Sequence, residues 1–131
     1  MLQQRPAFSG FSVNDIDAAR AFYADTLGVT VQENNNGMLT LELAGGQRVL
    51  IYPKDDHRAA TFTVLNFEVP DIDAGVDDLT GRGVTFERYE GMPQDDRGIM
   101  REYGPPIAWF TDPAGNVLAL IQTGEEERAS S

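Results

Sequence analysis

Cysteine is absent from the 131-residue sequence, and histidine occurs once, as His57. Without cysteine the chain forms no disulfide, offers no thiolate to zinc and has no cysteine nucleophile. A single histidine also leaves little support for metal sites, which commonly draw on several imidazoles. We take a cytoplasmic protein as the default, which the lack of cysteine fits.

Long apolar runs are also missing. No stretch approaches the roughly 20 apolar residues of a membrane-spanning helix. The first ten residues, MLQQRPAFSG, lack the apolar core of a signal peptide. We expect no membrane partner.

Basic residues are scarce, with 10 Lys and Arg against 21 Asp and Glu and a formal net charge of −11. Binding to nucleic acid through phosphate neutralisation requires clustered basic side chains, so this class of partner is excluded. The charge is compatible with attraction of a cationic small molecule. It is equally compatible with an acidic surface whose only role is solubility.

The sequence contains an internal repeat. FSVNDIDAARAFYADTLGV begins at Phe11, and FEVPDIDAGVDDLTGRGV begins 56 residues later (67 − 11) at Phe67. Each copy alternates like a strand and then reaches an acidic helix start, at Asp15 and at Asp71. Such carboxylates accept hydrogen bonds from free amides at a helix N-terminus. The repeat predicts two copies of a strand–helix unit.

Further strands are predicted after each helix. In the first half they cover residues 30–33, 38–43 and 48–52, and in the second half 85–89, 107–110 and 117–122. The sequence therefore predicts an α+β protein of two tandem β-α-β-β-β modules in a single domain. Module one covers about residues 7–54 and module two about 61–122, and residues 123–131 form a polar tail without an apolar face.

A long insertion, EGMPQDDRGIMREYGPP at residues 90–106, interrupts the second module. Connections of this length in a compact domain are usually functional lids or mobile loops. Met92, Ile99, Met100 and Tyr103 in this segment either cover a ligand or attach the loop to the body of the protein, and the sequence does not decide between the two.

Two stretches carry a family resemblance, VNDIDAARAFYADTLG near the start and WFTDPAGNVLALIQ near the end. With the paired modules, they resemble the vicinal oxygen chelate superfamily, which includes glyoxalase I, extradiol dioxygenases, and fosfomycin- and bleomycin-resistance proteins. The resemblance extends from about Ala7 to Gln122. It implies that the modules form a curved mixed-sheet cup that holds a ligand, and that the protein is a homodimer.

The resemblance also implies four metal-ligand positions, one on the first and one on the last strand of each module. Here these positions align with Phe8, Leu50, Val64 and Ala119, none of which has a donor atom suited to a divalent ion. A shift of one residue on any strand does not restore the site. We therefore expect no metal and no other cofactor. His57 lies in the polar stretch between the modules, where we expect it to be solvated and away from the cup.

Strand alternation predicts which side chains line the cup. They are Phe8, Gly10, Ser12, Arg48, Leu50, Tyr52, Val64, Asn66, Glu68, Trp109, Val117, Ala119 and Ile121. Apolar walls with a few polar groups are typical of a small-molecule pocket. Other roles remain open at this point, because Trp109 can simply fill space and Arg48 and Glu68 can pair or reach solvent.

The leading hypothesis is a metal-free small-molecule binding protein of the bleomycin-resistance-like type, with an apolar or aromatic and possibly cationic ligand. One alternative is a glyoxalase- or dioxygenase-like lyase or isomerase, in which Glu68 is a base and Tyr52 or Arg48 the electrophile. Others are a metal enzyme with an unrecognised ligand set and a partner subunit with a vestigial cup. The sequence identifies neither the ligand nor any reaction.

Overall fold

The computed structural model describes residues 1–123 and divides the chain into two compact units. The first unit comprises Met1–Ala59, and the second begins at Ala60. The division lies in the polar stretch in which the sequence places the module boundary. The predicted polar tail lies, from residue 124 on, outside the described residues.

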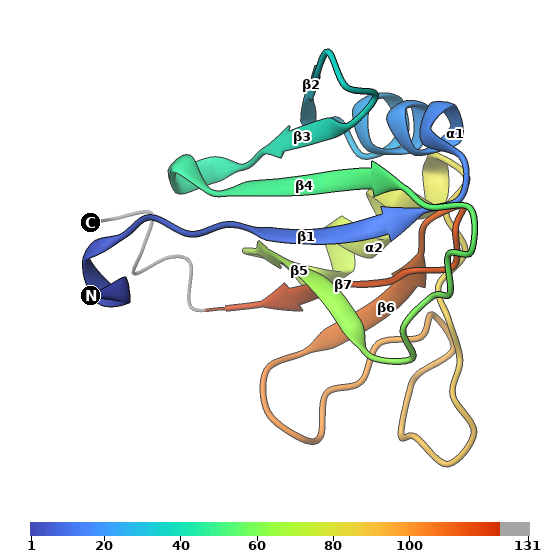
Figure 1. Ribbon diagram of the computed structural model, residues 1–131. Coiled ribbons are helices and arrows are strands. Elements are labelled where there is room, and N and C mark those ends of the chain that lie inside the picture. The colour runs from blue at the N-terminus through green and yellow to red at the C-terminus, as the bar shows by residue number, and fades with distance from the viewer. Residues whose placement is uncertain (124–131) are drawn as a thin grey trace. The chain divides into compact units, whose positions relative to one another are not determined.

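The first unit contains one helix and a four-stranded sheet (Figure 1). Its elements are β1 (Ser9–Val13), α1 (Ile16–Ala21), a π-helical turn (Phe22–Thr26), β2 (Thr30–Glu33), β3 (Leu39–Glu42) and β4 (Arg48–Pro53). Short 3-10 turns occur at Leu2–Gln4 and Ala44–Gly46. The strand order is β1-β4-β3-β2, with β1 parallel to β4 and the other pairs antiparallel.

One face of this sheet is covered by α1 and the turn that follows it. The Asp15 carboxylate accepts hydrogen bonds from the amides of Asp17 and Ala18 at 3.1 Å each, which starts the helix as predicted. The fully buried Tyr23 packs its ring against Phe11, with centroids 6.2 Å apart. The chain leaves the helical segment at Gly28, whose φ of 72° favours glycine. The core of this unit consists of Phe11, Val13, Ala19, Tyr23, Leu39, Leu41, Val49 and Ile51.

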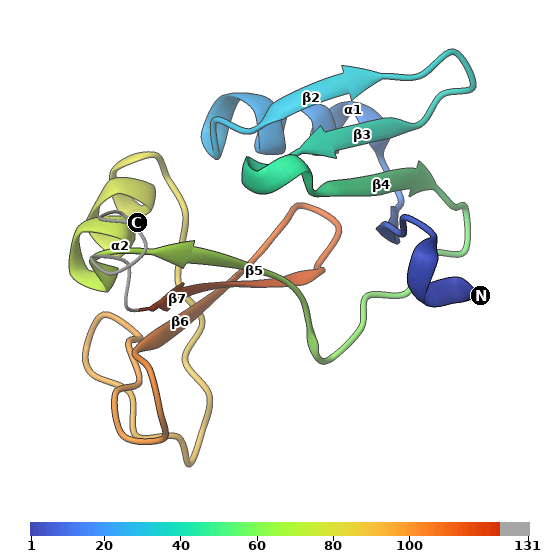
Figure 2. The same cartoon turned by 90° about the vertical axis from the view of Figure 1, so that its left-hand side faces the viewer.

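The second unit repeats this plan with fewer strands (Figure 2). Its elements are β5 (Thr63–Val69), α2 (Ile72–Gly81), β6 (Ile107–Thr111) and β7 (Val117–Gln122). The strand order is β5-β7-β6, with β5 parallel to β7 and β6 antiparallel to β7. The Asp71 carboxylate caps α2 just as Asp15 caps α1, by accepting from the amides of Asp73 and Ala74. The Ile72 amide donates to the Gln122 side chain at 2.8 Å, which ties the helix to β7.

The predicted strand at residues 85–89 was wrong. This segment makes a single bridge, from Phe86 to Phe110, and one further bond from the Glu87 amide to the Trp109 carbonyl. The reason is the side chain of Gln94, which donates to the Glu87 carbonyl at 2.9 Å and accepts from the Tyr89 amide at 2.7 Å. A side-chain amide thus satisfies backbone groups that a longer strand ladder would otherwise pair.

The motif TDPAGN between β6 and β7 has a structural explanation. Asp112 is buried, and one of its carboxylate oxygens accepts from the amides of Ala114 and Asn116 at 2.9 Å each. Its other oxygen accepts from the Asn116 side chain at 3.0 Å. A buried polar group requires such hydrogen-bond partners. The TDPAGN motif is therefore explained by the turn that it forms and not by a ligand site.

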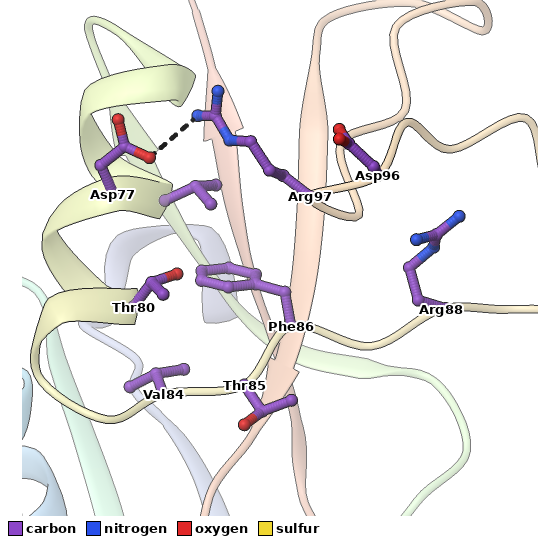
Figure 3. Close-up of a pocket in the computed structure, with 9 residues that line it drawn as sticks. Asp77, Thr80, Val84, Thr85, Phe86, Arg88, Asp96 and Arg97 are labelled. Carbon is purple, nitrogen blue, oxygen red and sulfur yellow. Dashed lines mark ion pairs between the residues drawn. The ribbon is translucent and has the colours of Figure 1, made fainter.

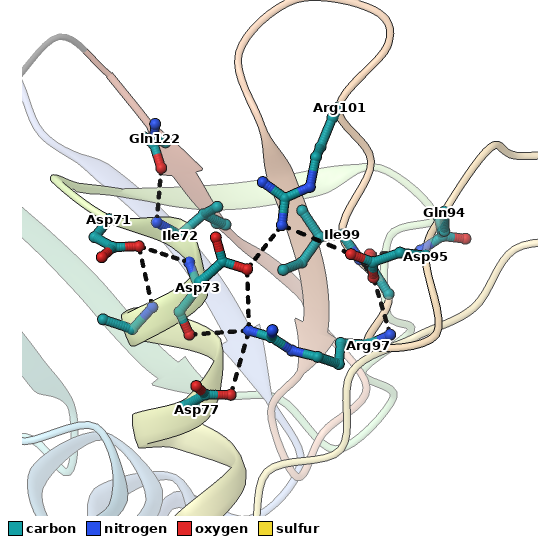
Figure 4. Close-up of polar contacts among 12 residues, drawn as sticks. Asp71, Ile72, Asp73, Asp77, Gln94, Asp95, Arg97, Ile99, Arg101 and Gln122 are labelled. Atoms are coloured by element: carbon teal, nitrogen blue, oxygen red, sulfur yellow. Dashed lines mark hydrogen bonds and ion pairs between the residues drawn. The ribbon is translucent and has the colours of Figure 1, made fainter.

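The insertion at residues 90–106 is attached to the second unit, which decides the question that the sequence left open for Ile99 and Met100 (Figure 4). Ile99 and Met100 are buried, and Met100 bridges to Gln94 and Ile107. Arg97 and Arg101 extend to Asp73 on α2, at 3.2 and 2.7 Å. Ile99 and Met100 therefore anchor the segment.

Two other side chains of the insertion remain at the surface. Met92 is 38% exposed and Tyr103 is 71% exposed. These two side chains are not buried as Ile99 and Met100 are, so they do not anchor the segment in the same way.

Candidate functional site

The face of the first sheet that α1 leaves uncovered carries the lining residues that the sequence predicts for this module. The register places Gly10 opposite Leu50 and Ser12 opposite Tyr52, so these side chains alternate with the core residues of β1 and β4. A Cβ at Gly10 would lie 3.9 Å from the Tyr52 ring, which shows that this ring leans over the glycine. Thr40, paired with Leu50, belongs to the same face and was not predicted.

A cation–π contact marks one end of this face. The guanidinium carbon of Arg48 lies 5.3 Å from the centroid of the Phe8 ring. Phe8 is 57% exposed, so the pair presents an apolar ring and a positive charge at the surface. The sequence predicts both residues as lining but not their mutual contact.

A short hydrogen bond marks the other end. The Ser12 hydroxyl oxygen lies 2.6 Å from His57 Nδ1, and both residues are half-buried. The prediction that His57 is remote from the lining residues was therefore wrong. The reason is the turn after β4, in which the Lys54 amide bonds to the Val13 carbonyl and the His57 amide bonds to the Lys54 carbonyl. These bonds return the chain to the end of β1.

The second sheet also has a face on the side opposite to its buried Phe110 and Leu118. Across this face Asn66, Ala119 and Trp109 stand in one row, because β7 pairs with both neighbouring strands. A second row holds Glu68, Ile121 and Ile107. Ala119 is buried, whereas Asn66 and Glu68 are exposed. The sequence predicts five of these six positions, Ile107 being the exception.

The predicted position of Val64 was wrong in one respect. The register pairs Thr63 with Val117 and Leu65 with Leu118, so Val64 is the extra residue of a β-bulge. The bulge shifts the alternation of the strand by one residue. Thr63 rather than Val64 consequently lies opposite Val117.

Of an aromatic pair formed by Trp109 of β6 and Tyr89, the sequence predicts only Trp109. The rings of Tyr89 and Trp109 meet edge to face, with centroids 5.5 Å apart. Tyr89 comes from the segment before the insertion, and burial together with the charge of Glu87 raises the pKa of its phenol. Alternation along residues 86–89 could have identified Tyr89. Phe86 meets the buried Phe110 edge to face, so Tyr89, three residues later, belongs to the opposite face, with Trp109.

Glu68, the candidate base, lies at the surface. It is exposed, and its carboxylate accepts a hydrogen bond from the Thr123 hydroxyl at 3.4 Å. The proposed base role rested on a carboxylate enclosed by apolar side chains. The observed surroundings do not provide that enclosure.

The side chains do not fit the metal that the fold family implies. Within residues 1–123, no group of three or more His, Asp or Glu side chains is arranged to hold a metal ion. The four aligned positions, Phe8, Leu50, Val64 and Ala119, carry only hydrocarbon side chains.

A cavity of about 320 Å³ lies elsewhere in the second unit, between α2 and the segment that follows it (Figure 3). The Phe86 ring points into it, and Arg97 reaches across its rim to Asp77 at 3.2 Å. The lining residues are Val76, Asp77, Thr80, Val84, Thr85, Phe86, Arg88, Asp96 and Arg97. None of them belongs to the predicted lining. The cavity is on the helix side of the sheet, toward which Phe86 points, whereas the predicted lining is on the opposite face.

Known proteins match this chain over most of its length. Residues 7–120 match the family described as the Glyoxalase/Bleomycin resistance protein/Dioxygenase superfamily. An uncharacterized protein of Bacillus subtilis (strain 168), YraH, is 28% identical over 124 residues, which cover 84% of this chain and 91% of that protein.

Solved structures agree with this match. A superfamily member from Sphaerobacter thermophilus DSM 20745 superposes with a TM-score of 0.69 at 24% identity, covering 92% of this chain and 99% of that one. An antibiotic binding protein from Streptomyces sp. CB03234, TnmS3, has a TM-score of 0.62 at 25% identity, covering 89% of this chain and 95% of that one.

Among the described residues, no helix has the length and apolar character needed to cross a bilayer. The repeated strand–helix units, the two mixed sheets and the match over residues 7–120 lead to one assignment. The chain belongs to the glyoxalase/bleomycin resistance protein/dioxygenase superfamily.

Proposed function

We propose that this protein binds a small, apolar or aromatic molecule on the face of its second sheet that α2 leaves uncovered. The observation that carries the proposal is the Tyr89–Trp109 pair, whose rings meet beside Ala119 in the row that β6 and β7 form. Aromatic rings on an otherwise apolar surface stack well on a flat ligand. Sparse polar groups then set the orientation of that ligand.

The same sheet of the second unit supplies polar groups. Asn66 stands in the row of Ala119 and Trp109, and Glu68 stands in the next row. A ligand with hydrogen-bonding substituents around an aromatic core suits this combination. The acidic net charge of −11 further favours a ligand with a positive charge, through long-range attraction.

The relationship to an antibiotic binding protein supports a binding role. That Streptomyces protein is 25% identical and shares the fold. We propose that this chain likewise holds its ligand without a metal, since no aligned metal position carries a donor atom. Sequestration of this kind needs a surface of the right shape and charge, and it needs no reacting group.

Calorimetric titration tests the proposal. Bleomycin represents cationic glycopeptides, and doxorubicin represents planar aromatic cations. We expect saturable binding of at least one of them, and Tyr89→Ala should weaken it at least several-fold, because the edge contact to Trp109 is lost.

Tyr103→Ala is the matched control, since Tyr103 is 71% exposed and has no ring contact to Trp109. It should leave the affinity unchanged. Equal weakening by the two substitutions would contradict the placement of the ligand beside Trp109.

A further inference from the structure

The contact between Ser12 and His57 has the geometry of a serine activated by a base. The hydroxyl oxygen lies 2.6 Å from Nδ1, within the range over which an O–H donates strongly to a ring nitrogen. In the tautomer with the proton on Nε2, Nδ1 accepts that hydrogen bond. A nucleophile and a base within hydrogen-bond reach are the first requirement for covalent catalysis.

Both partners are held in place by backbone structure. Ser12 lies within β1, in register with Tyr52 on β4. His57 is held by its turn, since the Lys54 amide bonds to the Val13 carbonyl at 2.9 Å and the His57 amide bonds to the Lys54 carbonyl at 3.1 Å. Backbone hydrogen bonds therefore fix the positions of Ser12 and His57 relative to each other. Two side chains on unconnected surface segments would not be fixed in this way.

The Ser12 side chain is partly accessible to solvent. Ser12 is on the sheet face opposite to the core residues Phe11 and Val13, and it is only half-buried. Its neighbour along that face is Gly10, which has no side chain of its own and over which the Tyr52 ring leans. Phe8, one residue before β1, offers an exposed apolar ring toward the other end of this face.

We propose that Ser12 is a nucleophile and His57 its general base, and that the pair hydrolyses small carboxylic esters with an apolar or aromatic acyl group. The Ser12 oxygen bonds to the ester carbonyl carbon while its proton passes to His57. The bond from that carbon to the alcohol oxygen then breaks, and the alcohol leaves with the proton from His57. Water, deprotonated by His57, releases the acid and restores Ser12, so that ester and water become acid and alcohol.

A fluorophosphonate probe tests this activity without knowledge of the natural ligand. Attack by Ser12 forms an oxygen–phosphorus bond, breaks the phosphorus–fluorine bond and transfers the hydroxyl proton to His57. We expect peptide mass spectrometry of the labelled wild-type protein to find the adduct on Ser12. The intact protein should also hydrolyse p-nitrophenyl acetate.

Two variants separate activation from structure. His57→Asn keeps a hydrogen-bonding group near the position of Nδ1 but removes the base, so labelling should slow by about 100-fold or more with little change in Tm. Ser9→Ala, on the same strand, is the matched control and should label at the wild-type rate.

Absence of an adduct on wild-type Ser12 would overturn the proposal. Labelling of His57→Asn at the wild-type rate would do the same, because the contact would then be only structural. Neither outcome bears on antibiotic binding, which the calorimetric titrations measure separately.

Discussion

The two units share a framework but differ in the chemistry of their sheet faces. In both, a parallel pair of strands flanks a helix capped by an aspartate, Asp15 or Asp71, with the same amide partners two and three residues on. The face of the first unit carries polar groups, with Ser12 bonded to His57 at one end and Arg48 over Phe8 at the other. The face of the second carries the aromatic pair of Tyr89 and Trp109 beside Ala119, with Asn66 and Glu68 exposed along β5.

This difference shows which parts of the repeat are under the same physical constraint. Helix caps and core positions must satisfy amides and fill volume in both copies, so both copies keep the same residue types there. Positions that face away from the helix carry no such requirement. They are free to hold a hydroxyl, an imidazole or an indole, and they are where the copies diverge.

The largest expected effect concerns equivalent core positions in the two units. Ile51 on β4 and Leu120 on β7 are both buried, so Ile51→Ala and Leu120→Ala should each lower the free energy of unfolding by about 2–5 kcal/mol. Leu50→Ala, one residue from Ile51 but on the other face, should cost distinctly less. Denaturant unfolding measures all three, and an equal loss for Leu50→Ala would contradict the division of the faces.

A smaller and equal effect is expected for the two helix caps. Asp15→Ala and Asp71→Ala each remove an acceptor of two amide hydrogen bonds and should each cost about 1 kcal/mol. The Asn variants keep an acceptor and should cost less. Denaturant unfolding again provides the measurement. A markedly different loss of unfolding free energy in the two Ala variants would show that the caps are not equivalent.

The attachment of the insertion to α2 distinguishes the second unit from the first. Asp73→Asn removes the carboxylate that pairs with Arg97 and Arg101, yet exposed ion pairs contribute only about 0–1 kcal/mol each. We therefore expect a small loss of stability but faster hydrogen exchange at Ile99 and Met100. Asp78→Asn removes one ion pair within α2 and should leave that exchange unchanged; equal acceleration by both would show that Asp73 does not anchor the insertion.

The smallest effect is a dependence of this attachment on pH. Burial acts to raise the pKa of the Asp95 carboxyl, but the amides of Ile99 and Arg97 and the charge of Arg101 outweigh it and hold that pKa below its usual value. A lowered pKa stabilises the folded segment above the unfolded value of about 3.9, and this contribution is lost as the pH falls below it.

Hydrogen exchange at Ile99, corrected for its intrinsic rate, should therefore show reduced protection as the pH falls from 6 to 3. Asp95→Asn should reduce that pH dependence. Protection that stays constant in the wild-type protein would contradict the assignment to Asp95.

The sequence predicts those features that a local pattern encodes. Alternation of apolar residues identifies β1, β7 and the buried Phe110, and the aspartates identify both helix starts. The strand at residues 85–89 could not be excluded from the sequence, because the Gln94 side chain that replaces its ladder comes from farther along the chain.

The positions on the uncovered sheet faces were predicted in part for the same reason. Alternation along β4 and β7 identifies Tyr52 and Ala119 correctly as residues away from the helix. The contact of His57 with Ser12 spans 45 residues and depends on how one turn is bonded, which no periodicity reports. The bulge at Val64 likewise follows from pairing with β7 rather than from the alternation of β5 itself.

The most direct test of the account uses Trp109, which is the only tryptophan in the chain and therefore the only source of indole fluorescence. Titration of the wild-type protein with bleomycin and with doxorubicin should produce a saturable change in that fluorescence for at least one of them, beyond the change seen with free tryptophan. No saturable change with either, under conditions in which calorimetry also detects no binding, would contradict the proposal that the aromatic face of the second unit binds such a molecule.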